Sequence, residues 1–250
     1  IKGTPTLGVD GVQGKAINFD NTDDHLCSDA NSDNTCDVDT AFNMSTVGWT
    51  ISLWFKHSAT APASGVDMIF EKCVNATPGQ AIGCVAAYMT TTGTVVVGND
   101  DDATWTQGSS YDVTATSTYT YNDNQWHQLV ITRTNANDVD SWIDGQGMNL
   151  STATGNTLTF DGSQIVTIGA SCSTTTGAAC AAANALNFWD GQIDDFQYIV
   201  GTTTQATMTQ LYVRRLYNSE RPRASKKTIT VTDATSATST SLTDTGEAWN

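Results

Sequence analysis

The stretch WHQLVITRTNANDVDSWIDGQ, residues 126–146, decides the fold class of this chain. It contains two runs, WHQLVITRT and DSWIDG, that are rich in the β-branched and aromatic residues typical of strands. The second run ends at Asp144-Gly145, and an Asp-Gly pair supplies the positive φ angles that a two-residue hairpin turn requires. The stretch therefore predicts short antiparallel strands joined by tight turns.

The same pattern recurs along most of the 250 residues. Further strand-like runs are KAINFD, WTISLWFKH, DMIFEKC, CVAAYMT, TVVVGN, YDVTATSTYTY, QIVTIGA and IDDFQYIV. One segment, TTQATMTQLYVRRLYN at 203–218, favours a helix instead, because Met208, Leu211 and Leu216 lie near one face. We expect an all-β protein with one short C-terminal helix.

Charge and length narrow the classes of function. The chain has 11 Lys and Arg against 26 Asp and Glu, a formal net charge of -15, which repels the phosphates of nucleic acids and of anionic lipids. No run approaches the roughly 18 apolar residues that span a bilayer. We therefore expect no nucleic-acid partner and no membrane insertion. The length suits one large domain followed by a tail.

The six cysteines indicate an oxidising compartment. They form three short-range pairs along the sequence: Cys27 with Cys36, Cys73 with Cys84, and Cys172 with Cys180. None has the CxxC spacing of a zinc ribbon, so three local disulfides are the favoured interpretation, and buried free thiols in a cytosolic protein are the alternative. Because the first residue, Ile1, is not methionine, we also expect that a leader or other upstream segment has been removed. The prediction is a secreted protein of the extracellular space or cell surface.

Secretion would also permit glycosylation. Three Asn-X-Ser/Thr tripeptides are present, although a chain rich in Ser and Thr contains such tripeptides by chance. They begin at Asn43, Asn75 and Asn149.

Four segments, taken in order, carry a likeness to a known family. They are GVQGKAINFDNTDDHL (11–26), WTISLWFKH (49–57), the stretch at 126–146, and FWDGQIDDFQYIV (188–200). The set resembles the LamG-like jelly rolls of the concanavalin A-like lectin and glucanase superfamily. The resemblance implies a two-sheet antiparallel jelly-roll sandwich in residues 1–223, followed by an extended tail at 224–250.

The resemblance also gives a role to the aspartates of FWDGQIDDFQYIV. In family members this stretch is a late core strand, which implies that Asp190-Gly191 forms its entry turn and that its aromatic residues pack between the sheets. A cation bound at Asp194 or Asp195 is the alternative.

The chain departs from the family at its two ends. LamG-like domains usually have another strand before the segment at 11–26, so ten preceding residues imply a missing outer strand and an open sheet edge. The tail alternates Thr with apolar residues, as a strand would. The two departures explain each other if the tail completes a sheet, either its own or that of a neighbouring copy. We predict that it pairs with the open edge of a neighbouring copy, which would make the protein a non-catalytic structural subunit of a filament or surface assembly. The donor residues would be Thr228, Ile229, Thr230, Val231, Thr232, Leu242 and Trp249.

Catalysis is not expected. The related glucanases cut sugars with a pair of glutamates, whereas Glu71 stands alone in MIFEKC and both Glu220 and Glu247 lie outside the sandwich pattern. The stretch at 188–200 does not reproduce the ExDxxE arrangement of those enzymes. We therefore predict that the protein is not an enzyme.

An acidic loop, DHLCSDANSDNTCDVDTAF at 24–42, is the best candidate for a metal site. Its alternating oxygen-bearing side chains would suit Ca²⁺, and a disulfide between Cys27 and Cys36 would hold the loop in shape. The central glycine and the bidentate Glu of an EF-hand are absent, so a solvated acidic loop remains the alternative. The candidate ligands are Asp29, Asn31, Asp33, Asp37 and Asp39.

A second functional hypothesis is a calcium-stabilised carbohydrate-binding or adhesion module. Aromatic rings in loop-rich or edge-like sequence bind sugars by stacking. The candidates for such contact with surface glycans are Trp105, Tyr119 and Tyr121.

Overall fold

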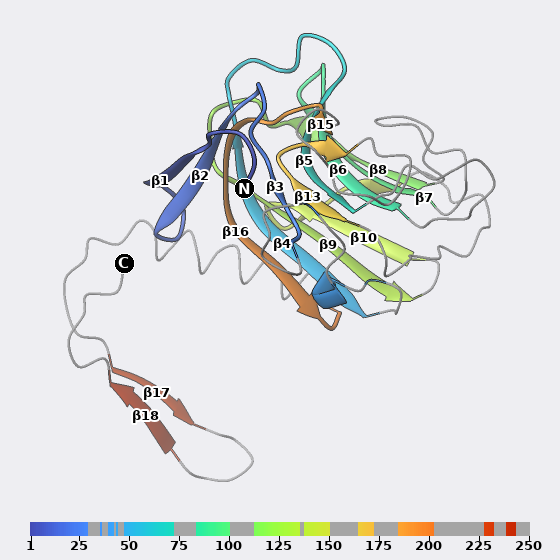
Figure 1. The fold of residues 1–250 in the computed structure, drawn as a ribbon. Helices are drawn as coiled ribbons and strands as arrows, with labels where there is room; N and C mark the ends of the chain where they lie inside the picture. The colour runs from blue at the N-terminus through green and yellow to red at the C-terminus, as the bar shows by residue number, and fades with distance from the viewer. Residues whose placement is uncertain are drawn as a thin grey trace.

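The computed structural model of the protein describes residues 1–29, 36, 40–42, 44, 48–72, 84–100, 113–135, 138–150, 165–172, 185–202, 228–232 and 239–243. In these residues the chain is almost wholly strand (Figure 1). The elements are β1 (Thr6–Asp10), β2 (Lys15–Asp20), β3 (Leu26–Cys27), the 3-10 turn η1 (Thr40–Phe42), β4 (Trp49–His57), β5 (Val66–Lys72), β6 (Cys84–Thr90), β7 (Thr94–Asp100), β8 (Val113–Thr120), β9 (His127–Asn135), β10 (Asp138–Ile143), β11 (Gln146–Gly147), β12 (Asn149–Leu150), β13 (Val166–Ile168), β14 (Ser171–Cys172), β15 (Ala185–Leu186), β16 (Asp190–Val200), β17 (Thr228–Thr232) and β18 (Ser239–Thr243).

Two seven-stranded antiparallel sheets make up the body of the fold. The first has the order β1-β2-β16-β4-β9-β10-β11, and the second has the order β12-β8-β7-β6-β5-β13-β3. The late strand β16 lies between the early strands β2 and β4 (Figure 1). This arrangement confirms the predicted antiparallel sandwich.

The stretch at 126–146 forms the hairpin that the sequence predicts. Strands β9 and β10 pair with Trp142 opposite Val130 and Ile143 opposite Leu129. Asp144 (φ 52°) and Gly145 (φ 75°) then turn the chain back into β11. Both turn residues have the positive φ angle that the Asp-Gly pair was expected to supply.

The core lies between the two sheets, and alternate residues of a strand contribute to it. On β4, Ile51, Leu53 and Phe55 are fully buried, and Val85 and Ala87 of β6 meet the same core from the other sheet. The largest fully buried side chains include the indoles of Trp49, Trp54 and Trp189. Burial of these apolar side chains is the main stabilising contribution to such a sandwich.

The N-terminal segment contains the outer strand that was expected to be missing. The ten residues before Gly11 do contain a strand, β1, which pairs with β2 through Thr6 opposite Asn18 and Leu7 opposite Ile17. The turn between them is short, because the Gly11 N–H donates to the Gly14 carbonyl at 3.2 Å. The sheet is therefore not short of a strand at this point, and its edge is β1 itself, which is largely exposed.

The stretch at 188–200 lacks the entry turn that was expected at Asp190-Gly191. Asp190 and Gly191 do not form a turn, because both already belong to β16 and pair with Asp20 and Phe19 of β2. Gly191 is required here because a Cβ would collide with the backbone of Lys56. The irregular point lies further on, where β16 bulges between Asp194 and Gln197.

The tail alternation at 228–232 does form a strand. It pairs with β18 of the same chain in a two-stranded sheet of its own, with Ile229 opposite Leu242. Figure 1 shows this hairpin apart from the sandwich. The predicted helix at 203–218 and Trp249 lie outside the described residues. Within the described part of the chain, no helix has the length and apolar character to cross a membrane.

Candidate functional site

The acidic loop is described only at its ends. Asp29 is half-buried, whereas Asn31, Asp33, Asp37 and Asp39 lie outside the described residues. The predicted disulfide between Cys27 and Cys36 is present, with a Cα–Cα distance of 5.4 Å. It ties the start of the loop, at the end of β3, to a point nine residues further along the chain.

Cys84 and Cys172 are disulfide-bonded as well. Their predicted partners, Cys73 and Cys180, lie outside the described residues. Every described cysteine is therefore oxidised.

A tight acidic turn lies just before the loop. Asp20, Asp23 and Asp24 each bring a carboxylate oxygen within 4.8 Å of the others. Asp20 and Asp23 are exposed and Asp24 is buried. The sequence pattern did not predict this group, because the alternate spacing of oxygen-bearing residues lies at 29–39 and not in the NTDD turn.

Asp24 supports the shape of this turn. Its Oδ1 accepts the Thr4 N–H at 2.7 Å and its Oδ2 accepts the Asp20 N–H at 3.2 Å. Burial raises the pKa of Asp24, and the nearby charges of Asp20 and Asp23 add to the increase, although the two hydrogen bonds oppose it. Because hard carboxylate oxygens are what Ca²⁺ prefers, the exposed Asp20 and Asp23 would be the ligands, with Asp24 holding the turn.

Glu71 is a buried carboxyl held by hydrogen bonds from Ser171 and Cys172. The Ser171 hydroxyl lies 3.0 and 2.9 Å from its two oxygens, and the Cys172 N–H donates to Oε2 at 2.8 Å. Burial raises the pKa of Glu71 to about 8, although these hydrogen bonds oppose the shift. The two other glutamates lie outside the described residues, so a glutamate pair is not found in the described part.

The aspartates of the β16 bulge accept hydrogen bonds from the β1–β2 turn and from within the bulge. Asp194 Oδ2 accepts the Gln13 N–H of the β1–β2 turn at 2.9 Å, and Asp195 Oδ1 accepts the side-chain N–H of Gln197 at 2.7 Å. Both border a cavity of about 110 Å³, which has room for a few waters. Its remaining lining comes from β2, β3, β13 and β16, namely Lys15, Ile17, Phe19, Leu26, Ile168, Ile193 and Phe196.

Tyr121 is not a glycan contact. It is only 7% exposed and packs edge-on against Phe55 and His127, at centroid distances of 6.2 and 4.7 Å. The His127 ring is in turn fixed between Asp144, at 2.7 Å, and Asp123, at 3.0 Å. The prediction was wrong because this tyrosine, although it follows an edge-like run, closes one end of the core.

Tyr119 has the opposite environment. Its side chain lies on β8 and is 66% exposed. The preceding residue, Thr118, accepts the Asn149 side-chain N–H at its Oγ1, at 3.1 Å. The following residue, Thr120, lies opposite Thr94 of β7. Asn149 itself is exposed, while Trp105 and the other two glycosylation candidates, Asn43 and Asn75, lie outside the described residues.

A row of threonines around the β6–β7 turn, which the sequence pattern did not predict, adds further hydroxyls. The hydroxyls of Thr90, Thr92 and Thr94 lie 2.8 to 3.1 Å apart around the β6–β7 turn. Since Thr94 pairs with Thr120, these hydroxyls adjoin the strand that carries Tyr119. Exposed hydroxyls and amides beside an aromatic ring are the groups that hydrogen-bond and stack on a sugar.

The family follows from a comparison with known sequence families. The model of the concanavalin A-like lectin/glucanases superfamily matches residues 29–209. The chain belongs to the concanavalin A-like lectin/glucanases superfamily. This confirms the resemblance seen in the sequence. Among curated proteins, no sequence matches this chain.

Solved structures share the fold of this superfamily member. The heptameric SAP-like pentraxin of Limulus polyphemus is 16% identical over 95% of each chain, with a TM-score of 0.51. Domain 4 of AbnA, an extracellular GH43 arabinanase of Geobacillus stearothermophilus solved with arabinotriose, is 15% identical over 84% of this chain and 82% of that one, with a TM-score of 0.52. The botulinum neurotoxin serotype G binding domain is 11% identical over 87% of this chain, which spans 46% of that domain, with a TM-score of 0.54. At these identities the likeness shows the fold alone.

Proposed function

We propose that this superfamily member is a secreted, non-catalytic carbohydrate-binding or adhesion module. The observation that carries the proposal is the exposed ring of Tyr119 on β8, the strand whose end pairs with the threonine-rich β6–β7 turn. The likeness to an arabinanase domain solved with arabinotriose and to a toxin binding domain supports a binding role. The buried Cys36 in a disulfide with Cys27 supports an oxidising, extracellular setting.

The chemistry of the Tyr119 surface favours a neutral sugar. The chain carries a formal net charge of -15, which would repel anionic glycans, and the residues before and after Tyr119 in sequence, Thr118 and Thr120, are uncharged. A pyranose or furanose ring presents C–H groups to an aromatic face and hydroxyls to the side. The exposed ring of Tyr119 offers such an aromatic face.

Replacing Tyr119 by alanine should weaken binding to a neutral oligosaccharide by at least about tenfold, which corresponds to about 1.4 kcal/mol. Removal of the ring eliminates the stacking surface without opening a core cavity, because the side chain is 66% exposed. The measurement is a screen on an array of neutral oligosaccharides that includes arabinotriose, followed by isothermal titration calorimetry on the positive sugars.

Two variants control this experiment. Tyr119→Phe keeps the ring and should keep most of the affinity, whereas Leu186→Ala removes another exposed apolar side chain, 48% exposed, from a different strand and should change nothing. Equal binding by wild type and Tyr119→Ala would rule out this surface. Absence of binding to every sugar on the array would rule out the carbohydrate-binding role.

We further propose that Ca²⁺ stabilises the module at the acidic turn and loop, through Asp20 and Asp23 and the candidate ligands at 29–39. Calcium at ten times its Kd should add about 1.4 kcal/mol to the free energy of unfolding, which raises the Tm of a domain this size by about 3–6 °C. Differential scanning calorimetry of metal-stripped protein with and without Ca²⁺ measures the shift.

The matched pair for the calcium test is Asp23→Asn against Asp10→Asn. Both remove one exposed carboxylate, but only Asp23 belongs to the acidic turn, whereas Asp10 pairs with Lys15 at 2.7 Å in the β1–β2 hairpin. The calcium-dependent shift should shrink in Asp23→Asn and persist in Asp10→Asn. An unchanged Tm at millimolar Ca²⁺ in the wild type would contradict the proposal.

A second candidate function is assembly through the tail, and one observation favours it. In the described part of the chain, β17 and β18 pair only with each other, so each has one edge that no described strand covers. The exposed edge strand β1 offers a surface for strand addition, with Leu7 57% exposed. The tail would then link one copy to the next.

The assembly hypothesis predicts that deletion of residues after Arg223 converts a polymer or ring into a monomer. Negative-stain microscopy and light scattering of the full chain beside the shortened chain measure this. Monomers from both would contradict the hypothesis and leave the binding module unaffected, since the Tyr119 surface lies outside the deleted segment.

A further inference from the structure

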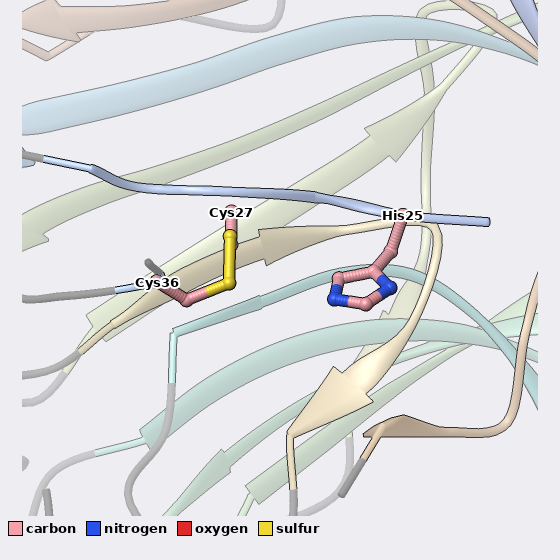
Figure 2. Close-up of side chains that lie close together, drawn as sticks. All are labelled: His25, Cys27 and Cys36. Atoms are coloured by element: carbon pink, nitrogen blue, oxygen red, sulfur yellow. A yellow bond between two sulfur atoms is a disulfide. The ribbon is translucent and has the colours of Figure 1, made fainter. Parts of the chain in front are cut away.

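Three side chains capable of binding a soft metal lie together at the start of the acidic loop. His25, Cys27 and Cys36 each place a ligand atom within 4.8 Å of the others. His25 immediately precedes β3, Cys27 ends it, and the disulfide brings Cys36 beside them. Figure 2 shows the imidazole next to the two sulfur atoms, with one ring nitrogen turned toward them.

The hydrogen bonding of His25 sets its tautomer. Nδ1 lies 3.2 Å from the carbonyl oxygen of Asp23, and because a carbonyl only accepts, Nδ1 must carry the proton. Nε2 then holds a free lone pair. An N–H donated from the other ring nitrogen to a backbone carbonyl is the arrangement that orients histidines in metal sites.

The Nε2 lone pair has no hydrogen-bond partner among the described residues, although His25 is fully buried. A disulfide sulfur has no proton to donate to it. An unpaired buried polar atom costs free energy, so its persistence calls for an explanation.

We propose that His25, Cys27 and Cys36 form a Zn²⁺ site that opens when the Cys27–Cys36 disulfide is reduced. With a phosphine reductant, the S–S bond breaks, the phosphine becomes its oxide with oxygen from water, and the two hydrogens of that water end on the sulfurs. Zn²⁺ then displaces both thiol protons to solvent and binds two thiolates and Nε2. In the oxidised protein neither sulfur is a thiolate, so the site is closed.

The distances and charges suit zinc. Tetrahedral Zn²⁺ with Zn–S bonds of about 2.3 Å and a Zn–N bond of about 2.0–2.1 Å holds its ligand atoms about 3.5–3.8 Å apart, which small side-chain movements reach from the present separations. Two thiolates, one neutral imidazole and Zn²⁺ sum to zero charge. The site therefore fits its surroundings, where Cys36 is buried with Ile165, Ala170 and Ala185. A fourth position is left for water.

The test uses the full chain, reduced with tris(2-carboxyethyl)phosphine, and Co²⁺ as the spectroscopic probe. Reduced wild type should bind Co²⁺ with a thiolate charge-transfer absorption and intense tetrahedral d–d bands, both lost when Zn²⁺ is added. Oxidised wild type should show neither. His25→Gln should weaken Co²⁺ binding at least tenfold after reduction, whereas the control His127→Gln, which removes a histidine from another part of the fold, should leave it unchanged.

Alkylation mapped by mass spectrometry distinguishes this pair from the other cysteines. In reduced protein, Zn²⁺ should slow the reaction of iodoacetamide with Cys27 and Cys36 at least tenfold, and leave Cys84 and Cys172 as reactive as without metal. Protection of other cysteines, equal Co²⁺ affinity in His25→Gln and wild type, or a reduced chain that binds no Co²⁺ would each overturn the proposal.

Discussion

Replacing Trp189 by alanine should lower the free energy of unfolding by about 3–5 kcal/mol, the range for a large aromatic side chain removed from a core. The side chain is fully buried and meets Phe55 and His57 edge-on, at centroid distances of 5.9 and 4.6 Å. Its indole N–H has no hydrogen-bond partner among the described residues, so packing is its contribution. The Trp189 backbone also joins the two sheets, because its N–H donates to Gly169 and its carbonyl accepts from Asn21.

Urea unfolding followed by fluorescence and circular dichroism measures this loss. Leu186→Ala is the control, because Leu186 lies three residues earlier in the chain and is 48% exposed; it should change the free energy of unfolding by no more than about 0.5 kcal/mol. A loss below about 1 kcal/mol in Trp189→Ala would mean that this indole does not pack in the core as the structure indicates.

Glu71→Gln should make the protein markedly more stable at pH 9 and leave it little changed at pH 5. Burial raises the pKa of Glu71 from its usual 4.5 to about 8. The folded state therefore binds the proton more tightly than the unfolded state, so stability falls as pH rises between these two values and is flat above them. At about 1.4 kcal/mol for each tenfold change in proton affinity, the wild type should lose about 5 kcal/mol across that window.

Glutamine reproduces the neutral acid at this position. Its carbonyl oxygen can accept the Cys172 N–H, and its amide can donate to the Ser171 hydroxyl, as the protonated carboxyl would. Free energies of unfolding measured at pH 5, 7 and 9 test the prediction. Asp10→Asn serves as the control, because an exposed carboxylate whose pKa is lowered by Lys15 does not titrate in this window. Equal slopes for wild type and Glu71→Gln would show that Glu71 is not the group responsible.

The sequence by itself determined the features that depend on neighbouring residues. Apolar residues at every second position, such as Leu53 and Phe55 of β4 and Leu129 and Ile131 of β9, face the core because successive residues of a strand point to opposite faces. The pair Asp144-Gly145 sets its own turn through backbone sterics. Cys27 and Cys36 lie nine residues apart, close enough for a local disulfide. The order of such segments was sufficient to identify the superfamily.

Only the tertiary structure decided which of the singled-out residues remain available at the surface. Tyr119 and Tyr121 are two positions apart in one edge-like run, yet one ring is exposed and the other closes the core against Phe55, a residue more than sixty positions away. Asp24 is buried because Thr4, from the N-terminal segment, donates to it. The lone pair of His25 faces two sulfurs because a disulfide brings Cys36 back to β3. These environments arise from contacts between segments distant in sequence, and local composition carries no information about which segments will meet.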